Sequence, residues 1–407
     1  MSTVRPGLRA LDEALAELLG FASALADVES VPTFDADGRV LAQDLVSGLH
    51  VPPQDNSSMD GYALRCADLP QTSGLLPVHQ RIAAGSPAAP LAAGSAARIF
   101  TGAPIPAGAD AVVMQEDCEL QGDRVQVKAQ PVPGQWIRRA GEDVTLGATV
   151  LASGQRLTPA ALGLAASIGM AALAVRRRPR VALFSTGDEL VMPGQVAPAD
   201  MKPGAIYNSN RFFLRALLLR LGCEVSDLGI VPDRLDATRE ALRAAAQAHD
   251  LILTSGGVSV GEEDHIKPAV QSLGELTLWQ IAIKPGKPFA YGRVQDTHFI
   301  GLPGNPVSSY VTFLLLVRPF LLKLQGVTDL TTKTIAAQAH FDWPRADRRR
   351  EFLRVRRNVA GGLELFPNQS SGVLTSAVWA DGLVDNAPGR TIAYGDSVRF
   401  IPFAEVL

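Results

Sequence analysis

The regular alternation of strand-like and helix-like segments after Arg180 constrains the fold of this chain more than any other sequence feature. Short apolar runs typical of strands lie at Val181–Ser185, Glu224–Val231, Leu251–Thr254, Leu276–Ile283 and His298–Leu302. Segments with a helical apolar period follow them, at Asn210–Leu221, Leu235–Ala248, Asp264–Leu273 and Val307–Leu324. Strands that alternate with helices require crossover connections. The pattern therefore predicts a mainly parallel sheet with helices on both faces, in an α/β domain of residues 179–327.

The segments on either side of this pattern predict three further structural units. An amphipathic helix opens the chain, and a helical pattern returns at Pro159–Val175. Between them, residues 50–143 consist of short β-like runs broken by glycine and proline. We therefore expect a β-rich domain of residues 50–143, inserted into an elongated helical first domain of residues 1–49 and 144–178. Short alternating runs in residues 328–407 predict a small all-β domain at the end.

Composition excludes several classes of function. A net charge of −3 argues against a dedicated nucleic-acid binder. Three widely spaced cysteines provide neither a disulfide framework nor a zinc ribbon, and the six histidines show no metal-ligand spacing. Acidic residues interrupt the first twenty residues, where a signal peptide needs an unbroken apolar stretch, and the uncharged segment Ala160–Val175 is too short for a membrane span. We expect a cytoplasmic protein without a membrane or nucleic-acid partner.

Glycine, proline and acidic residues gather where the strands of the α/β domain should end. They lie in five segments: Thr186–Glu189, Pro232–Asp233, Ser255–Asp264, Lys284–Pro288 and Leu302–Pro306. Because ligands of open α/β sheets bind just outside the carboxyl ends of the strands, the five segments predict one binding site.

The residue types in these segments suit a phosphorylated ligand. A glycine-rich stretch that leads into a helix offers bare backbone amides and hydroxyls to an oxyanion, here through Ser255, Gly256, Gly257 and Ser259. Lys284 and Lys287 add positive charge. Carboxylates beside phosphates commonly hold Mg²⁺, and the candidate metal ligands are Glu189, Asp233 and Asp264.

Each motif taken alone has a purely structural alternative. A Ser-Gly-Gly stretch forms turns, Thr-Gly-Asp-Glu can cap a helix, and Pro303 and Pro306 can shape the start of the next helix. Two clusters outside the α/β domain, Asp55–Tyr62 and Phe100–Pro104, are compatible with a tight turn and a hairpin. The coincidence of five motifs at successive strand ends nevertheless favours a site.

A run of seven arginines between positions 345 and 357 marks the start of the last domain. A solvated edge strand protected by charge explains most of them. Arg354 and Arg356 alternate with apolar residues, so one face of that strand could direct two guanidinium groups at an anion.

Six motifs, taken in order, resemble those of the MoeA family of molybdopterin molybdenumtransferases. They are DNSSMDGY (55–62), FTGAP (100–104), STGDEL (185–190), TSGGVSVG (254–261), KPGKP (284–288) and LPGNP (302–306). The resemblance covers nearly the whole chain. TSGGVS alone would be less specific, because molybdopterin adenylyltransferases share it.

The resemblance implies insertion of molybdenum, supplied as molybdate, into adenylylated molybdopterin, with release of AMP and assistance from Mg²⁺. It also implies four domains and a homodimer whose cleft lies between the α/β domain of one subunit and the inserted domain of the other. The residues that it assigns as functional are Asp60, Thr101, Glu189, Asp233, Asp264, Lys284, Pro303, Pro306, Arg354 and Ser371. The adenylyltransferase and the molybdoenzyme apo-proteins are the partners that it suggests. Gln280 departs from the family pattern, where some relatives carry lysine.

Two rival functions remain open from the sequence. A molybdopterin adenylyltransferase would use the same α/β domain, although it would not require the DNSSMDGY segment or the C-terminal β-domain. A non-catalytic cofactor-binding scaffold would need a long linker and a further fused domain.

Overall fold

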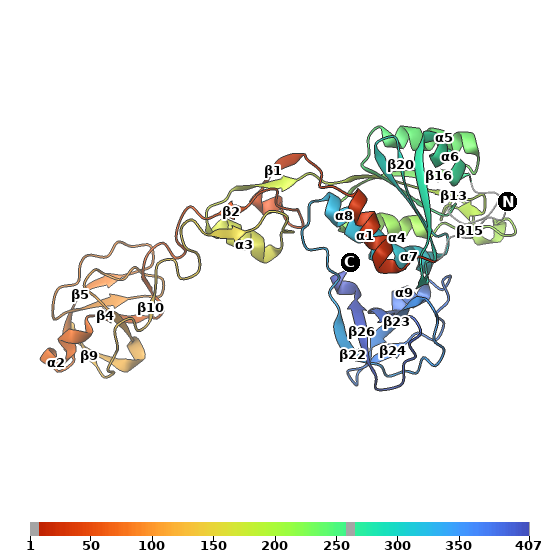
Figure 1. Cartoon of the computed structure of the whole chain (residues 1–407). Helices are drawn as coiled ribbons and strands as arrows, with labels where there is room; N and C mark the ends of the chain where they lie inside the picture. The colour runs from red at the N-terminus through yellow and green to blue at the C-terminus, as the bar shows by residue number, and fades with distance from the viewer. Residues whose placement is uncertain (1–7, 258–264, 407) are drawn as a thin grey trace.

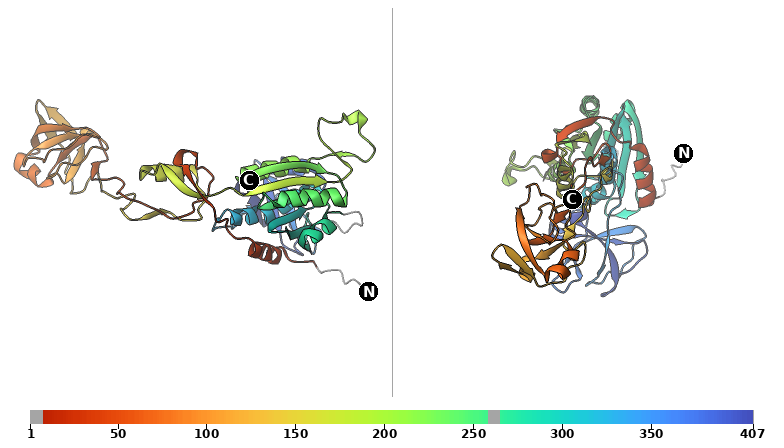
Figure 2. Two further views of the ribbon diagram at one scale, coloured as in Figure 1. Left: turned by 90° about the horizontal axis from the view of Figure 1, so that it is seen from above. Right: turned by 90° about the vertical axis from the view of Figure 1, so that its left-hand side faces the viewer.

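The computed structural model describes residues 8–257 and 265–406 and shows an elongated molecule (Figure 1). A β-rich lobe lies at one end, an arm of short two-stranded sheets lies in the middle, and the α/β domain and C-terminal β-domain lie together at the other end (Figures 1 and 2). The lobe is therefore far from the α/β domain of its own chain.

The α/β domain is built on a six-stranded sheet of order β16-β13-β17-β21-β20-β18. Its strands are β13 (Arg180–Thr186), β16 (Glu224–Val231), β17 (Leu251–Ser255), β18 (Gly274–Gln280), β20 (Pro288–Val294) and β21 (Thr297–Leu302). The pairs β13–β16, β13–β17 and β17–β21 are parallel, as predicted, whereas β20 pairs antiparallel with β18 and β21. Sequence reasoning missed β20 because proline and glycine surround its start, although proline is tolerated as the first residue of a strand.

Helices cover both faces of this sheet. Along β13, Val181 and Leu183 face one core while Ala182 and Phe184 face the other, as the two-residue period of a strand requires. The first core contains residues of α4 (Asn210–Arg220), α7 (Pro306–Thr312) and α8 (Arg318–Leu324), and the second contains residues of α5 (Leu235–Ala246) and α6 (Ile266–Leu273). A π-helical turn, Phe313–Val317, joins α7 to α8.

The continuous helix Pro306–Leu324 is long and apolar enough to cross a membrane. In this fold 78% of that window is buried inside the protein. Its apolar residues are therefore accounted for by the first core of the α/β domain.

The expected helical first domain is wrong in two respects. Helix α1 (Leu11–Phe21) packs into the α/β core through Leu11, Ala14 and Leu18, instead of forming a separate domain. The expected helix Pro159–Val175 stops at Ser167, as α3 (Pro159–Ser167), and is followed by Gly169 with a φ of +84° and by strand β12 (Ala172–Arg176). In residues 172–175 alanine alternates with a larger apolar residue, and this period of two fits a strand although we inferred a helical period there.

The arm instead consists mainly of paired strands around α3. Strand β1 (Val28–Pro32) pairs with β12, and β2 (Leu45–Val46) pairs with β11 (Thr149–Leu151), both antiparallel. Where the arm meets the α/β domain, Arg177 forms ion pairs with Asp27 at 2.6 Å and with Asp250 at 2.7 Å. Arg177 therefore connects the arm to the start of β17.

The inserted lobe is β-rich, with a sheet of order β7-β4-β6-β5-β9-β8 and a separate β3–β10 pair. Its elements are β3 (Asn56–Ser57), β4 (Gly61–Leu64), α2 (Leu69–Thr72), β5 (Leu75–Ile82), β6 (Ala96–Ile99), β7 (Ala111–Met114), β8 (Cys118–Gln121), β9 (Arg124–Val127) and β10 (Ile137–Arg138). Gly61 permits the β4–β7 approach, because a Cβ there would lie 1.8 Å from the Val113 carbonyl oxygen. The glycine of DNSSMDGY thus has a packing role.

The C-terminal β-domain shares a sheet with the α/β domain. Its elements are β22 (Ile335–Gln338), β23 (Arg350–Arg357), β24 (Leu363–Leu365), α9 (Thr375–Trp379), β25 (Gly382–Asn386) and β26 (Ser397–Pro402). The short strand β19 (Ile283–Lys284) leaves the α/β domain and pairs parallel with β23. The expected strand Leu276–Ile283 is therefore divided between two sheets.

Candidate active site

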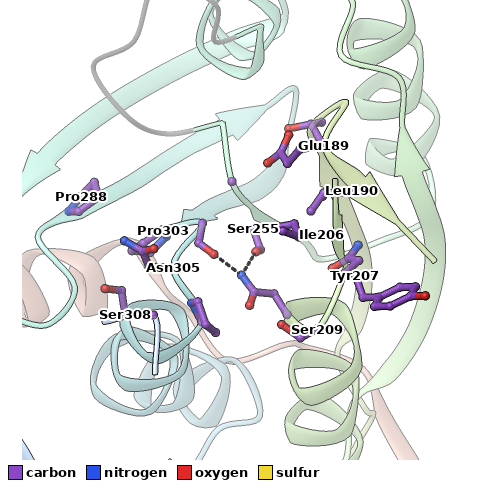
Figure 3. Close-up of a pocket in the computed structure, with 17 residues that line it drawn as sticks. Glu189, Leu190, Ile206, Tyr207, Ser209, Ser255, Pro288, Pro303, Asn305 and Ser308 are labelled. Carbon is purple, nitrogen blue, oxygen red and sulfur yellow. Dashed lines mark hydrogen bonds between the residues drawn. The ribbon is translucent and has the colours of Figure 1, made fainter. Parts of the chain in front are cut away.

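A cavity of about 600 Å³ lies at the carboxyl ends of β13, β17 and β21, where the sequence motifs predict a site (Figure 3). Of the predicted site residues, Glu189, Ser255, Gly256, Pro303 and Pro306 line it. The sequence did not single out the other described lining residues as ligand contacts: Thr186, Leu190, Ile206, Tyr207, Asn208, Ser209, Asn210, Pro288, Gly304, Asn305, Ser308 and Gly372.

Asn210 joins two loops of the cavity. Its Nδ2 donates to the Ser255 Oγ at 2.8 Å and to the Gly304 carbonyl at 2.7 Å, as the dashed lines in Figure 3 mark. The side chain is almost buried, at 7% exposure. From the sequence, Asn210 was recognised only as the first residue of a helix.

The two glycines after β17 are required by the backbone. Gly256 and Gly257 have φ angles of +92° and +65°, which other residues adopt only with strain. The Gly256 N–H donates to the Leu302 carbonyl at 3.0 Å, and a Cβ on Gly256 would lie 3.1 Å from the Thr186 carbonyl oxygen. The turn therefore holds the ends of β13, β17 and β21 close together.

Glu189 brings an exposed carboxylate to the cavity. The chain reaches it through Gly187, whose φ is +142°, and a Cβ on Gly187 would lie 2.5 Å from the Glu189 Oε2. The next residues form β14 (Leu190–Val191), which pairs with β15 (Ile206–Tyr207). These two short strands place Ile206 and Tyr207 in the wall, and strands of two residues leave no periodic signal in a sequence.

Asn208 presents a buried donor beside the cavity. Its Oδ1 accepts from the Arg211 N–H at 3.3 Å, while its Nδ2 has no hydrogen-bond partner among the described residues. Buried amide groups normally find a partner. This Nδ2 is therefore an enclosed donor without a partner among the described residues, in a side chain of the cavity wall.

No lysine or arginine side chain belongs to the lining within residues 8–257 and 265–406. Lys284 lies outside it, in ion pairs with Glu351 at 3.0 Å and Asp347 at 3.5 Å. Arg349 also binds Asp347, and its hydrogen bonds hold the pKa of that carboxyl well below the usual range. Lys287 is exposed and is not part of the lining.

Only one of the three predicted metal ligands lies at the cavity in the described structure. Glu189 lines the cavity, Asp233 does not, and both Asp264 and Ser259 lie outside the described residues. No group of three histidine, cysteine, aspartate or glutamate side chains converges within the described ranges. Binding of a metal by Glu189, Asp233 and Asp264 thus stays a prediction.

The C-terminal β-domain closes one side of the cavity. Gly372 lines it, and the Ser371 carbonyl accepts from the Val307 N–H at 2.9 Å, next to Pro306. This contact brings predicted residue Ser371 to the start of α7.

Arg354 does not face an anion, and the interpretation of two guanidinium groups on one free face is wrong. Its side chain is 1% exposed and donates to the Ser376 Oγ and to the carbonyls of Phe352 and Ser370. Burial lowers the pKa of Arg354 to about 10. Arg356 instead pairs with Glu364 and lies over the Trp379 ring. Arg354 therefore supports the loop that carries Ser371.

Asp60 and Thr101 form an exposed hydrogen-bonded pair in the inserted lobe, and this lobe lies at the opposite end of the molecule from the α/β domain (Figure 1). The Thr101 N–H and Oγ1 each donate to the Asp60 Oδ1 at 2.8 Å. The backbone hydrogen bond, followed by that of the hydroxyl, lowers the pKa of Asp60. The lobe therefore presents a carboxylate that is ionised at neutral pH.

The three thiols are poor nucleophiles. Burial raises the pKa of Cys66 and Cys118 to about 11 and that of Cys223 to about 12. A thiol with such a pKa stays protonated at neutral pH.

The fold and cavity define a multidomain protein with an α/β domain built to bind a ligand at the carboxyl ends of its central strands. Three family models match successive parts of the chain. They are the MoeA N-terminal region (domain I and II) at residues 9–169, the probable molybdopterin binding domain at residues 182–323, and the MoeA C-terminal region (domain IV) at residues 336–403. The chain belongs to the MoeA family of molybdopterin molybdenumtransferases, which confirms the resemblance found in the sequence.

Individual relatives agree with this assignment. A molybdopterin molybdenumtransferase of Haemophilus influenzae is 46% identical over 318 residues, which cover 78% of each chain. Molybdopterin molybdenumtransferase 2 of Mycobacterium tuberculosis is 39% identical over 370 residues, or 88% of this chain and 90% of the relative. The crystal structure of the molybdopterin biosynthesis moeA protein from Pyrococcus horikoshii superposes with a TM-score of 0.85 at 30% identity, covering 97% of this chain and 99% of that one. The protein is accordingly a transferase of molybdenum cofactor biosynthesis, with molybdopterin and molybdenum as substrates.

Proposed function

We propose that this enzyme inserts molybdenum from molybdate into adenylylated molybdopterin, with release of AMP and formation of molybdenum cofactor. The observation that carries the proposal is the cavity at the carboxyl ends of β13, β17 and β21, in a chain of this family. Its polar groups suit the phosphate part of such a substrate.

The cavity can hold phosphate oxygens through neutral donors. The Ser255 hydroxyl already accepts from Asn210, so its own O–H remains to donate to a ligand oxygen. The Asn208 Nδ2 offers a second donor. Asn208, Ser209 and Asn210 bring the N-terminus of the eleven-residue helix α4 to the cavity, and a helix N-terminus favours negative charge.

Glu189 fits the requirement of Mg²⁺ for one or two carboxylates beside substrate phosphates. A Mg²⁺ ion held there would neutralise charge that develops on the phosphoryl oxygens during AMP release. Asp233 and Asp264 complete the ligand set that we propose. Water attacks the phosphorus, the phosphoanhydride bond breaks and AMP leaves, so no protein nucleophile is needed.

Molybdate is an oxyanion and requires cationic partners. The described lining provides none, so we assign its capture to the KPGKP loop, with Lys284 and Lys287. Lys284 keeps 40% of its side chain exposed in its ion pairs and can still contact an arriving anion.

We further propose a cytoplasmic homodimer in which Asp60 and Thr101 act at the cavity of the partner subunit. The pair is exposed, and the lobe that carries it is separated by the arm from the α/β domain of its own chain (Figure 2), which supports the proposal. The adenylyltransferase that supplies the substrate and the apo-proteins of molybdoenzymes are the proposed transient partners.

One assay separates this function from its two rivals. Purified protein is incubated with adenylylated molybdopterin, Mg²⁺ and molybdate, and AMP and molybdenum cofactor are measured. A molybdenumtransferase forms both. An adenylyltransferase instead consumes ATP in a second reaction with unmodified molybdopterin. A scaffold releases no AMP in either reaction. Either result would refute the proposal.

A further inference from the structure

A second cavity of about 470 Å³ lies in the inserted lobe, between β4, β5, β6 and the turn that joins β8 to β9. Its lining contains two arginines, Arg81 and Arg98, and one histidine, His79. The described lining of the candidate active site contains no arginine or lysine. The lobe cavity therefore offers the positive charge that the cavity of the α/β domain lacks.

The two arginines are held close together. Arg81 of β5 lies directly opposite Arg98 of β6 in the register of these parallel strands. Both guanidinium groups lie over the Phe100 ring, with the Arg81 Cζ 4.4 Å and the Arg98 Cζ 4.6 Å from its centroid. Arg98 also lies 5.2 Å from the centroid of the Tyr62 ring. Cation–π contacts thus hold two like charges on one face of the lobe.

No carboxylate in the described part of the chain forms an ion pair with either arginine. Arg98 donates to two neutral acceptors, the Gly61 carbonyl at 3.0 Å and the Gln115 Oε1 at 2.6 Å. Asp123 also lines the cavity but pairs with neither arginine. Like charges placed opposite each other on neighbouring strands are destabilising, and an anion bound between them would remove this cost.

The pair also has the donors that an oxyanion needs. A guanidinium group carries five N–H donors in one plane, of which Arg98 uses two and Arg81 uses none among the described residues. Arginine matches the geometry of oxyanions by donating two parallel hydrogen bonds. We propose that Arg81 and Arg98 form an oxyanion-binding site in the lobe, which takes molybdate or a phosphate group of the same tetrahedral shape.

The site adjoins the Asp60–Thr101 pair. Arg98 donates to the carbonyl of Gly61, which follows Asp60, and Phe100 directly precedes Thr101. In the proposed homodimer the lobe would therefore bring positive charge, together with the Asp60 carboxylate, to the cavity of the partner subunit. Positive charge at a cleft raises the local concentration of an anionic substrate. This use of the site rests on the proposed function, whereas binding of the oxyanion does not.

Calorimetric titrations of the full-length protein with sodium molybdate and with inorganic phosphate test the site. Arg81→Gln should weaken binding of the preferred oxyanion about tenfold, as expected for loss of one charge-assisted contact. Arg81→Lys should weaken it less, because lysine keeps the charge but not the two parallel donors. Since Arg81 is exposed, neither change should disturb the fold. The oxyanion that binds more tightly identifies the source, free molybdate or a phosphate group.

Arg124→Gln is the matched control, since Arg124 is an exposed arginine of β9 in the same lobe and lies outside the lining. It should leave both affinities unchanged. Equal weakening by Arg81→Gln and Arg124→Gln would assign the effect to the general charge of the lobe and overturn the inference. Binding of both oxyanions with wild-type affinity in Arg81→Gln would overturn it as well.

The same titrations with Lys284→Ala separate the lobe site from the proposed function. If Arg81→Gln weakens molybdate binding and Lys284→Ala does not, the lobe site stands and capture by the KPGKP loop falls. If only Lys284→Ala weakens it, the lobe site is refuted and the proposed function stands. If the lobe binds the oxyanion but no AMP is released from adenylylated molybdopterin, the site stands and the proposed reaction falls.

Discussion

Asn210 shows how much one residue contributes to this site, because its carboxamide alone connects Ser255 to Gly304. We expect Asn210→Asp, which keeps the size but removes both donors, to separate the two loops. AMP release should fall roughly 10–100-fold, the range expected when reacting groups are misplaced by about an ångström. Steady-state kinetics measure this, and a melting curve close to wild type shows that the fold is retained. Unchanged kcat would mean that this connection is dispensable.

Glu189 gives a second test at the level of single residues. Glu189→Gln should impair AMP release and raise the Mg²⁺ concentration needed for half-maximal rate, because a neutral amide is a weaker ligand for a hard cation. Asp188→Asn is the matched control, since Asp188 is the neighbouring exposed carboxylate and is not part of the lining. Normal turnover of Glu189→Gln at limiting Mg²⁺ would remove the metal role.

Prediction of site residues from the sequence succeeded where the backbone itself dictates the residue type. Gly256 is recognisable because the turn needs a positive φ, and Pro306 because proline is favoured in the first turn of a helix. Asn208 and Tyr207 escaped prediction because two-residue strands position them. Arg354 was wrongly predicted to direct its guanidinium group at an anion. The alternation of residues along a strand gives the face of the sheet on which a side chain lies, whereas the exposure of that side chain depends on the loop that covers the face.

At the scale of elements, the α/β alternation was predicted well because β13, β17 and β21 are apolar on both faces and each is followed by a connection. The prediction failed where contacts with distant parts of the chain determine the structure of a segment. Helix α1 looks like part of a first domain until its apolar face is seen against α8. The split of one predicted strand into β18 and β19 follows from pairing with β23, which no local pattern contains.

Strand β21 carries a pH-dependent contribution to stability. His298 is 8% exposed and lies 2.9 Å, through its Nδ1, from the Tyr291 hydroxyl, and burial lowers its pKa from 6.5 to about 4. The unfolded chain therefore takes up a proton near pH 6.5 that the folded chain takes up only near pH 4. The stabilisation is complete above pH 6.5 and is lost as the pH falls towards 4, by on the order of 3 kcal/mol.

Urea unfolding of wild type and His298→Asn between pH 4 and 7.5 measures this contribution. Asparagine keeps an acceptor for the Tyr291 hydroxyl but does not titrate. The variant should show a shallower fall in unfolding free energy below pH 6.5. Parallel curves for the two proteins would assign the acid sensitivity to other groups.

At the scale of the whole molecule, the distance between the lobe and the cavity leads to a complementation test. Asp60→Ala and Glu189→Gln should each be impaired as homodimers. In a mixed dimer with the proposed shared cleft, one cleft would carry both changes and the other would carry neither. Random exchange makes about half of the dimers mixed, so activity should approach about a quarter of wild type.

Differently tagged subunits provide the control for this experiment. Co-purification of the two tags shows that mixed dimers have formed, and an Asp60→Ala sample mixed with wild type sets the scale for partial activity. Verified exchange without recovered AMP release would contradict the shared cleft.

Because the arm is long, its junction with the α/β domain at Arg177 determines where the lobe lies. The carboxylates of Asp27 and Asp250 hold Arg177 from two sides, and backbone hydrogen bonds from Leu25 to Leu324 and from Thr328 to Gly154 join the same junction. A small rotation at the base of the arm produces a large displacement of the lobe at its tip. In the proposed homodimer, the precision with which Asp60 reaches the cavity of the partner subunit would be decided at the opposite end of the arm, so that a substitution at this junction would lower activity without changing a substrate contact.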